Sequence, residues 1–161
     1  MVGGITMEIQ IRNVNTDDIE MWIELSQEYD IYVNELVGDL SEWYDGNEND
    51  ISFKEYMKSK IAKNEALIAT TDICQGIVAF SKTYNRITFF AISHKANFEH
   101  VSHCLIDYVL NLLNTEKQIS INIIKSNAEI IKKQRIVLSE YGFVFNSDDV
   151  ENGVPVERYV R

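Results

Sequence analysis

The stretch between residues 66 and 124 restricts the fold of this chain more than any other part of its sequence. Three apolar segments, at 66–71, 76–83 and 87–93, are separated by short turns, which predicts an antiparallel meander. An apolar repeat at helical spacing follows, made of Val101, Cys104, Leu105, Tyr108, Val109 and Leu112. Residues 118–124 then alternate as a buried strand. Because a strand, a helix and a strand in succession form a right-handed parallel crossover, we expect an α/β fold, a mixed sheet with helices on both faces.

The flanking segments add further strands. Residues 8–14 predict the first strand, and residues 143–145 and 156–160 predict the last two, with a polar hairpin turn at 148–153. We expect all of these elements to belong to one domain over residues 1–161, with residues 1–7 as a flexible leader.

Three helix starts have recognisable capping residues. Thr16, Asp17 and Asp18 predict the beginning of a helix that runs to about Tyr32. The pattern S-x-x-E at 52–55 and S-x-x-E at 126–129 predict two more starts. Gly142 predicts the end of the last helix, because glycine readily adopts the left-handed conformation found there.

Charge and composition narrow the range of partners. The net charge of −10 repels phosphate backbones, so a nucleic acid is not expected, whereas an amine-bearing partner is favoured. No apolar run approaches the roughly 20 residues that span a bilayer, so no membrane partner is expected. Cys74 and Cys104 lack metal-binding or redox spacing and predict buried free thiols in a cytoplasmic protein.

The order of the elements resembles the GNAT family of N-acetyltransferases over nearly the whole chain. The resemblance rests on Ile11-Arg12 followed by residues 16–18, on residues 87–113, and on Leu-Ser-Glu-Tyr-Gly-Phe at 138–143. It implies transfer of an acyl group from acetyl-CoA to an amine. It also implies that two central parallel strands splay apart around pantetheine, and that the pyrophosphate lies at the start of the following helix. A helix start suits an anion, since its first N–H groups are free.

The implied cofactor-binding residues depart from the family pattern. Its Arg/Gln-x-x-Gly-x-Gly/Ala loop aligns with residues 97–102, which contain no glycine and carry Glu99. The expected contacts there come from Asn97, Phe98, His100, Val101 and Ser102. The N–H groups of Ala91, Ile92 and Ser93 are the expected donors to the thioester carbonyl.

The implied proton-transfer residues are also altered. Leu138 stands where many family members have a tyrosine acid, and Tyr141 is the candidate substitute. Candidate bases are Tyr84, His94 and a carboxylate from residues 37–50, although Tyr84 fits a turn aromatic and His94 a surface cap residue better than a base. The acids around Trp43 in that segment suit a cationic amine, or else a solvated loop.

A metal site is the weaker interpretation of the histidines. His100 and His103 are three residues apart on one helix, Asp107 follows, and His94 precedes them. Zinc needs three or four converging ligands, whereas histidines at this spacing commonly lie on a solvated face, so no metal is expected.

Two functions stay open at this point. One is an N-acyltransferase that uses acetyl-CoA or another acyl-CoA and acts on an amine, whether a small molecule or a peptide. The other is a non-catalytic GNAT-like domain that binds a partner or forms a homodimer, and the absent glycines and Leu138 favour it.

Overall fold

A computed structural model describes residues 8–33, 53–151 and 153–161. In these ranges the elements are β1 (Gln10–Asn13), the 3-10 turn η1 (Thr16–Asp18), α1 (Ile19–Val33), α3 (Phe53–Ala62), β2 (Ala66–Thr70), β3 (Cys74–Ser81), β4 (Arg86–Ile92), α4 (Phe98–Leu112), β5 (Ser120–Ile124), α5 (Glu129–Glu140), β6 (Val144–Glu151) and β7 (Val154–Val160). The expected leader at 1–7, the acidic segment at 37–50 and the capping Ser52 lie outside the described residues.

A seven-stranded mixed sheet organises the described part of the chain, in the order β1-β2-β3-β4-β5-β7-β6. β2, β3 and β4 pair antiparallel, which confirms the predicted meander. β4 and β5 pair parallel, and α4 connects them, which confirms the predicted crossover. None of the helices in the described ranges combines the length and the apolar character that a membrane crossing requires.

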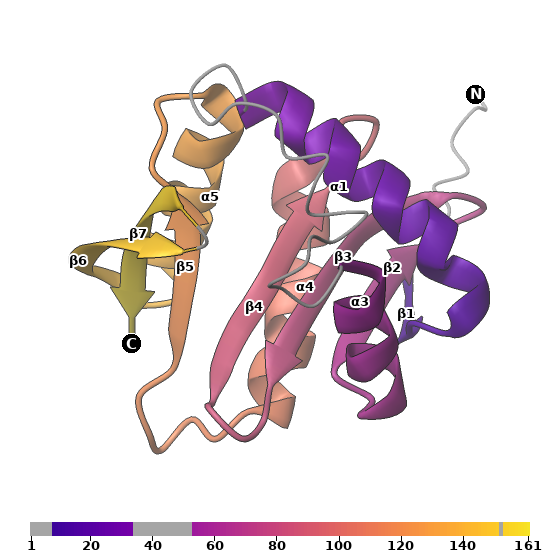
Figure 1. Cartoon of the computed structure of the whole chain (residues 1–161), viewed down its shortest axis with the longest axis horizontal. Coiled ribbons are helices and arrows are strands. Elements are labelled where there is room, and N and C mark those ends of the chain that lie inside the picture. Colours follow the sequence, from indigo (N-terminus) through magenta and orange to yellow (C-terminus); the bar gives the residue numbers. More distant parts are fainter. Residues whose placement is uncertain (1–7, 34–52, 152) are drawn as a thin grey trace.

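Helices cover both faces of this sheet, as predicted (Figure 1). Side chains of α1 and α3 form one apolar core with β2, β3 and β4, and Trp22 and Met57 are fully buried within it. Side chains of α4 and α5 form a second core on the opposite face, around Leu105, Ile119 and Leu138. Strands buried on both faces explain why the central segments are apolar throughout rather than alternating.

The predicted residues at the ends of the helices are confirmed at one position and differ at two. Gly142 ends α5 with a φ of 84°, as expected. The cap of η1 is Asn15 rather than Thr16, because its side chain accepts from the amide of Asp17. At α5 the predicted cap Ser126 is wrong: its hydroxyl accepts from the amide of Ala128, and the helix begins after Ala128 without a side-chain cap.

The predicted hairpin turn at 148–153 is also wrong at its start. β6 continues to Glu151, and Asp148, Asp149 and Val150 pair with residues of β7. β6 is one of the two edge strands of this sheet, and most of its side chains are exposed. Polar residues are therefore tolerated along the strand, and its composition is that of a turn.

Candidate functional site

The parallel strands β4 and β5 are joined only at their beginnings. Two residue pairs connect them, Arg86 with Ser120 and Ile87 with Ile121. Directly after this, the register of β4 against β3 shifts: Ile87 lies opposite Phe80 and Phe89 opposite Ala79, which leaves Thr88 as an extra residue. An extra residue bends a strand and increases its twist. The bend turns the rest of β4 away from β5, so the sheet opens between them.

A cavity of about 160 Å³ lies at this opening. Apolar residues of both strands line it, including Phe90, Ile123 and Ile124. Polar side chains reach it from elements on both faces of the sheet: Tyr29, Asp30, Thr88, Asn122, Gln134 and Glu151. The cavity therefore combines an apolar wall with several groups that can orient a ligand, as small-molecule sites do.

Oxygen acceptors dominate one side of the cavity. The amide nitrogen of Asn122 donates to the Glu151 carboxylate at 3.0 Å, and Arg86 lies 4.0 Å from the same carboxylate. The buried Oδ1 of Asn122 has no hydrogen-bond partner among the described residues. A buried acceptor without a partner costs free energy, so a ligand with an N–H donor would be stabilised there.

Gln134 of α5 occupies the opening itself. This side chain is 1% exposed, and its Nε2 donates to the carbonyl oxygen of Phe90 on β4 at 3.2 Å. Its Oε1 accepts from the hydroxyl of Tyr29 on α1 at 3.0 Å. Burial raises the pKa of Tyr29, which keeps this hydroxyl protonated as a donor. α1 and α5 lie on opposite faces of the sheet, so this bridge passes between β4 and β5.

The register of β4 decides which of its backbone groups face the opening. The amide of Ser93, directly after β4, donates to the carbonyl of Gln75 on β3 at 2.9 Å. Since antiparallel partners alternate, Ala91 and Ser93 direct their N–H groups to β3, and Phe90 and Ile92 direct theirs to the opening. Of the three predicted thioester donors, Ile92 is thus the one that faces the cavity side.

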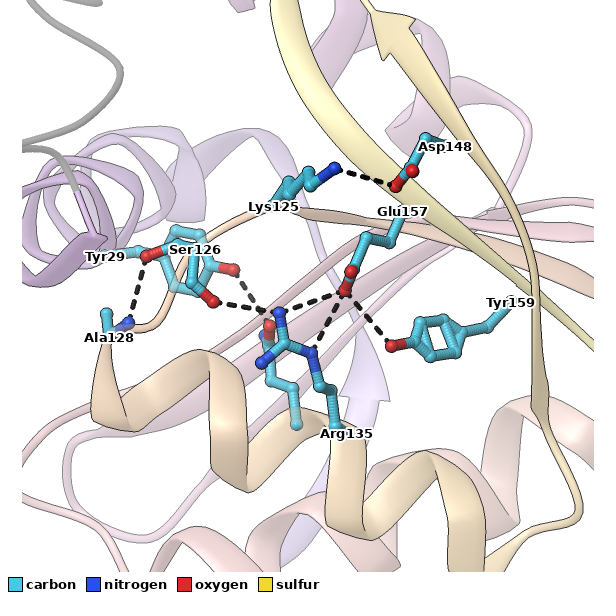
Figure 2. Close-up of polar contacts among 9 residues, drawn as sticks. Tyr29, Lys125, Ser126, Ala128, Arg135, Asp148, Glu157 and Tyr159 are labelled. Atoms are coloured by element: carbon cyan, nitrogen blue, oxygen red, sulfur yellow. Dashed lines mark hydrogen bonds and ion pairs between the residues drawn. The ribbon is translucent and has the colours of Figure 1, made fainter.

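A polar network fixes α5 beside the opening (Figure 2). Arg135 donates to the carboxylate of Glu157 on β7 at 3.0 Å and to the carbonyl of Ser126 at 2.9 Å. The hydroxyl of Tyr159 donates to the same Glu157 oxygen at 3.1 Å. Both partners of the Arg135–Glu157 pair are partly buried, so the pair anchors α5 more firmly than an exposed pair would.

The start of α4 differs from the expectation for a pyrophosphate loop. The side chain of Asn97 caps the helix by accepting from the amide of His100, and the carbonyl of Asn97 accepts from the amide of Val101. Val101 and Ser102 are fully buried, and their N–H groups lie within the hydrogen-bonded helix.

The free donors at this helix start are instead its first two amides. In the described part of the chain, the N–H groups of Phe98 and Glu99 have no acceptor. The ring of Phe98 packs against Phe90 of β4. The ammonium of Lys133 lies 6.0 Å from the centre of the Phe98 ring, and so brings positive charge to the helix start from α5.

The three candidate proton-transfer residues lie apart from one another. Tyr84 is 77% exposed at the turn before β4, beside the closed end of the β4–β5 pair. His94 follows β4, where its backbone amide and its ring Nδ1 contact the carboxylate of Glu28. Tyr141 follows α5, and its hydroxyl donates to Asp107 at 2.7 Å; burial and this carboxylate raise its pKa. None of the three lines the cavity.

The histidines do not gather in the way that the zinc interpretation required. Among the described residues, the cluster that could hold an ion is Glu99, His103 and Glu140, whose ligand atoms lie within 4.8 Å of one another. His94 and His100 lie outside this cluster, and both carboxylates are exposed. Exposed acids at this spacing are ordinary surface features.

Sequence reasoning missed the residues that define the cavity. Gln134 interrupts the buried stripe of α5 between Ile131 and Leu138, and Asn122 interrupts the run of isoleucines in β5. A polar side chain at an apolar position of a periodic element was the signal available for both.

Comparison with solved structures identifies the fold, whereas comparison of sequences does not. No protein-family model matches the chain, and no curated protein matches it in sequence. Solved structures do match. A GNAT-family acetyltransferase from Bacillus cereus has a TM-score of 0.67 at 14% identity, and 96% of each chain is covered. An N-acetyltransferase from Staphylococcus aureus has a TM-score of 0.63 at 11% identity, with 94% of this chain and 100% of that chain covered.

Two further matches have named substrates. The ribosomal-protein-S18-alanine N-acetyltransferase from Escherichia coli has a TM-score of 0.60 at 10% identity, with 95% of this chain and 92% of that chain covered. The spermidine N-acetyltransferase from Vibrio cholerae has a TM-score of 0.58 at 16% identity, with 94% and 93% covered. With this agreement over the full length, and with its sheet open between β4 and β5, the chain has the fold of the GNAT acetyltransferases.

Proposed function

We propose that this protein is an N-acyltransferase that moves an acyl group from an acyl-CoA, such as acetyl-CoA, to an amine. The observation that carries the proposal is the opening after the second residue pair of β4 and β5, with a cavity at that point. Strands that stayed paired along their whole length would leave no room for a ligand between them.

The residues around the opening fit such a donor. Beyond its two residue pairs with β5, β4 presents the backbone groups of Phe90 and Ile92 towards the opening, where the amides of a ligand arm could pair with them. The first amides of α4 and the ammonium of Lys133 suit phosphate oxygens, whereas Glu99 opposes them. The buried hydroxyl of Ser102 on α4 has no hydrogen-bond partner among the described residues. A polar ligand atom within reach would give this hydroxyl the partner that it lacks.

The acceptor side suits an amine. When bound, the acyl-CoA supplies a thioester whose carbonyl carbon accepts the nitrogen lone pair; the C–N bond forms, the C–S bond breaks and the thiolate takes up a proton. Oδ1 of Asn122 and the carboxylate of Glu151 would hold the amine by accepting its N–H groups, and the Glu151 carboxylate would receive its proton, directly or through one water. The amide of Ile92 would polarise the thioester carbonyl. The acceptors of the Escherichia coli and Vibrio cholerae proteins, an alanine amine and spermidine, support an amine here.

A second candidate is a non-catalytic domain with this fold. Two observations favour it: Gln134 already uses the Phe90 carbonyl, and Leu138, where the family acid was expected, is fully buried. Such a domain would bind a partner or form a homodimer without using CoA.

Ligand-dependent unfolding temperature separates the two candidates. Acetyl-CoA at 100 times its Kd should stabilise the protein by about 2.7 kcal/mol, which raises Tm by roughly 5–10 °C for a chain of this size. Release of free thiol should then require both acetyl-CoA and a primary amine. No shift at millimolar acetyl-CoA would favour the non-catalytic domain.

Substitutions test the acceptor side. Glu151→Gln should lower kcat/KM for the amine about tenfold or more, because it removes both the carboxylate that holds the amine beside Asn122 and the proton acceptor. The matched control is Glu116→Gln, which removes the same charge from an exposed residue after α4. An equal effect of both substitutions would show that overall charge, and not the cavity, attracts the amine.

A further inference from the structure

The side chain of Gln134 is held in the opening by partners on both sides of the sheet. It lies on the buried stripe of α5, where an apolar side chain would satisfy the packing. A buried amide is costly unless it is hydrogen-bonded, and both functional atoms of Gln134 have a partner, the Phe90 carbonyl and the Tyr29 hydroxyl. The position is therefore built for an amide group, and not merely tolerant of one.

The carbonyl of Phe90 is an acceptor that the sheet itself does not use. Phe90 pairs with Val78 on β3 in a position whose backbone groups point away from β3, and at this depth β5 has already separated. A ligand that lies along this edge of β4 and carries an amide N–H has this carbonyl as its acceptor. Gln134 Nε2 makes the same interaction from within the chain.

We propose that Gln134 is an internal competitor for the acyl-CoA arm and sets the affinity for it. This inference rests on the proposed transferase function. The pantetheine arm of CoA carries amides, so it can take the Phe90 carbonyl only when Gln134 releases it and withdraws from the opening. Tyr29 strengthens the competition, because its hydroxyl holds the other end of the Gln134 amide.

Two substitutions at Gln134 separate its volume from its hydrogen bonds. Gln134→Ala removes both, whereas Gln134→Leu removes the hydrogen bonds and keeps most of the volume. Tyr29→Phe keeps the ring but removes the hydroxyl that holds Gln134. Isothermal titration of acetyl-CoA and of CoA into the wild type and the three variants gives Kd without any need for an amine. Urea unfolding of each variant verifies that it is folded.

The expected result is a Kd about tenfold lower for Gln134→Ala than for the wild type, since one released hydrogen bond and the freed space favour the ligand. Tyr29→Phe should lower Kd by a smaller factor, and it tests the same competition if the alanine variant does not fold. Gln134→Leu should gain less than Gln134→Ala, because it frees the Phe90 carbonyl but keeps most of the volume in the opening. Binding only by Gln134→Ala would also support the inference. Equal gains for Gln134→Ala and Gln134→Leu support the inference in a narrower form, in which the hydrogen bond to the Phe90 carbonyl competes with the ligand and the volume of the side chain does not.

Other results overturn it in distinguishable ways. If the wild type binds acetyl-CoA and the Gln134→Ala and Tyr29→Phe variants bind it no more tightly, then Gln134 is not a competitor. The proposed transferase function would be unaffected by this result. No binding of CoA or acetyl-CoA by any of the four proteins removes the inference and the proposed transferase together.

Discussion

Replacement of Gly76 by alanine should destabilise the sheet next to the opening. Gly76 lies on β3 directly opposite Ile92 of β4. A Cβ at this position would lie 2.7 Å from Cδ1 of Ile92, 3.0 Å from the carbonyl oxygen of Ala91 and 3.2 Å from Cδ1 of Leu105. The Ile92 methyl group can rotate away, but the Ala91 oxygen is backbone and can move only with β4.

The sign of the effect follows from two opposing magnitudes. Overpacking of this kind costs about 1–3 kcal/mol. Alanine in place of glycine returns about 0.4–1 kcal/mol by restricting the unfolded chain. The free energy of unfolding should therefore fall by about 1–2 kcal/mol, measured by urea denaturation with the slope unchanged.

A double-mutant cycle identifies the cause. Ile92→Val removes the nearest clashing methyl group and by itself should cost about 0.5–1.5 kcal/mol. Combined with Gly76→Ala, it should cost at least about 0.5 kcal/mol less than the sum of the two single changes. An alanine variant as stable as the wild type, or strictly additive single changes, would refute the packing argument.

Three further outcomes are expected. Arg135→Met should lower the free energy of unfolding by about 1.5–3 kcal/mol in urea, because it leaves the largely buried Glu157 without its charged partner; a loss below about 0.5 kcal/mol contradicts this anchoring role. Arg12 lowers the pKa of Asp18 below its ordinary value of 3.8. The Arg12–Asp18 pair therefore stabilises the folded state above pH 3.8, and this stabilisation is lost as the pH falls through the lowered pKa. The Tm difference between wild type and Asp18→Asn should accordingly shrink in acid, and a constant difference argues against the pair. Gly142→Ala should cost about 1–2 kcal/mol through the left-handed conformation alone, since nothing lies within 4 Å of the added Cβ; unchanged stability in thermal unfolding would show that this backbone relaxes.

Helices and strands that depend on the pattern of neighbouring residues could be predicted from the sequence, whereas most of the cavity between β4 and β5 could not. The meander, the crossover and the end of α5 at Gly142 each depend on residues close together in the chain. The opening depends instead on the extra residue Thr88, which nothing in the local sequence distinguishes. The partners of Gln134 are 44 and 105 residues away, so its role emerges only after α1, β4 and α5 have assembled.

The amides that the resemblance assigned to phosphate contacts lie within a regular helix in the structure. The resemblance placed them at Val101 and Ser102 by alignment with a loop that contains glycines. Without glycines, the chain begins a regular helix at Phe98, capped by Asn97, and those two amides become part of the helix. A capping residue therefore moved the free donors towards the N-terminus, to Phe98 and Glu99.

Tyr29 connects the two faces of the sheet through the opening between β4 and β5. An uninterrupted sheet insulates the side chains on one face from those on the other, but Tyr29 packs against the apolar clusters of both faces. Whatever enters or leaves between β4 and β5 must therefore disturb α1 and α5 at once. Hydrogen exchange in these two helices should therefore change together when a ligand occupies the opening, although the helices cover opposite faces of the sheet.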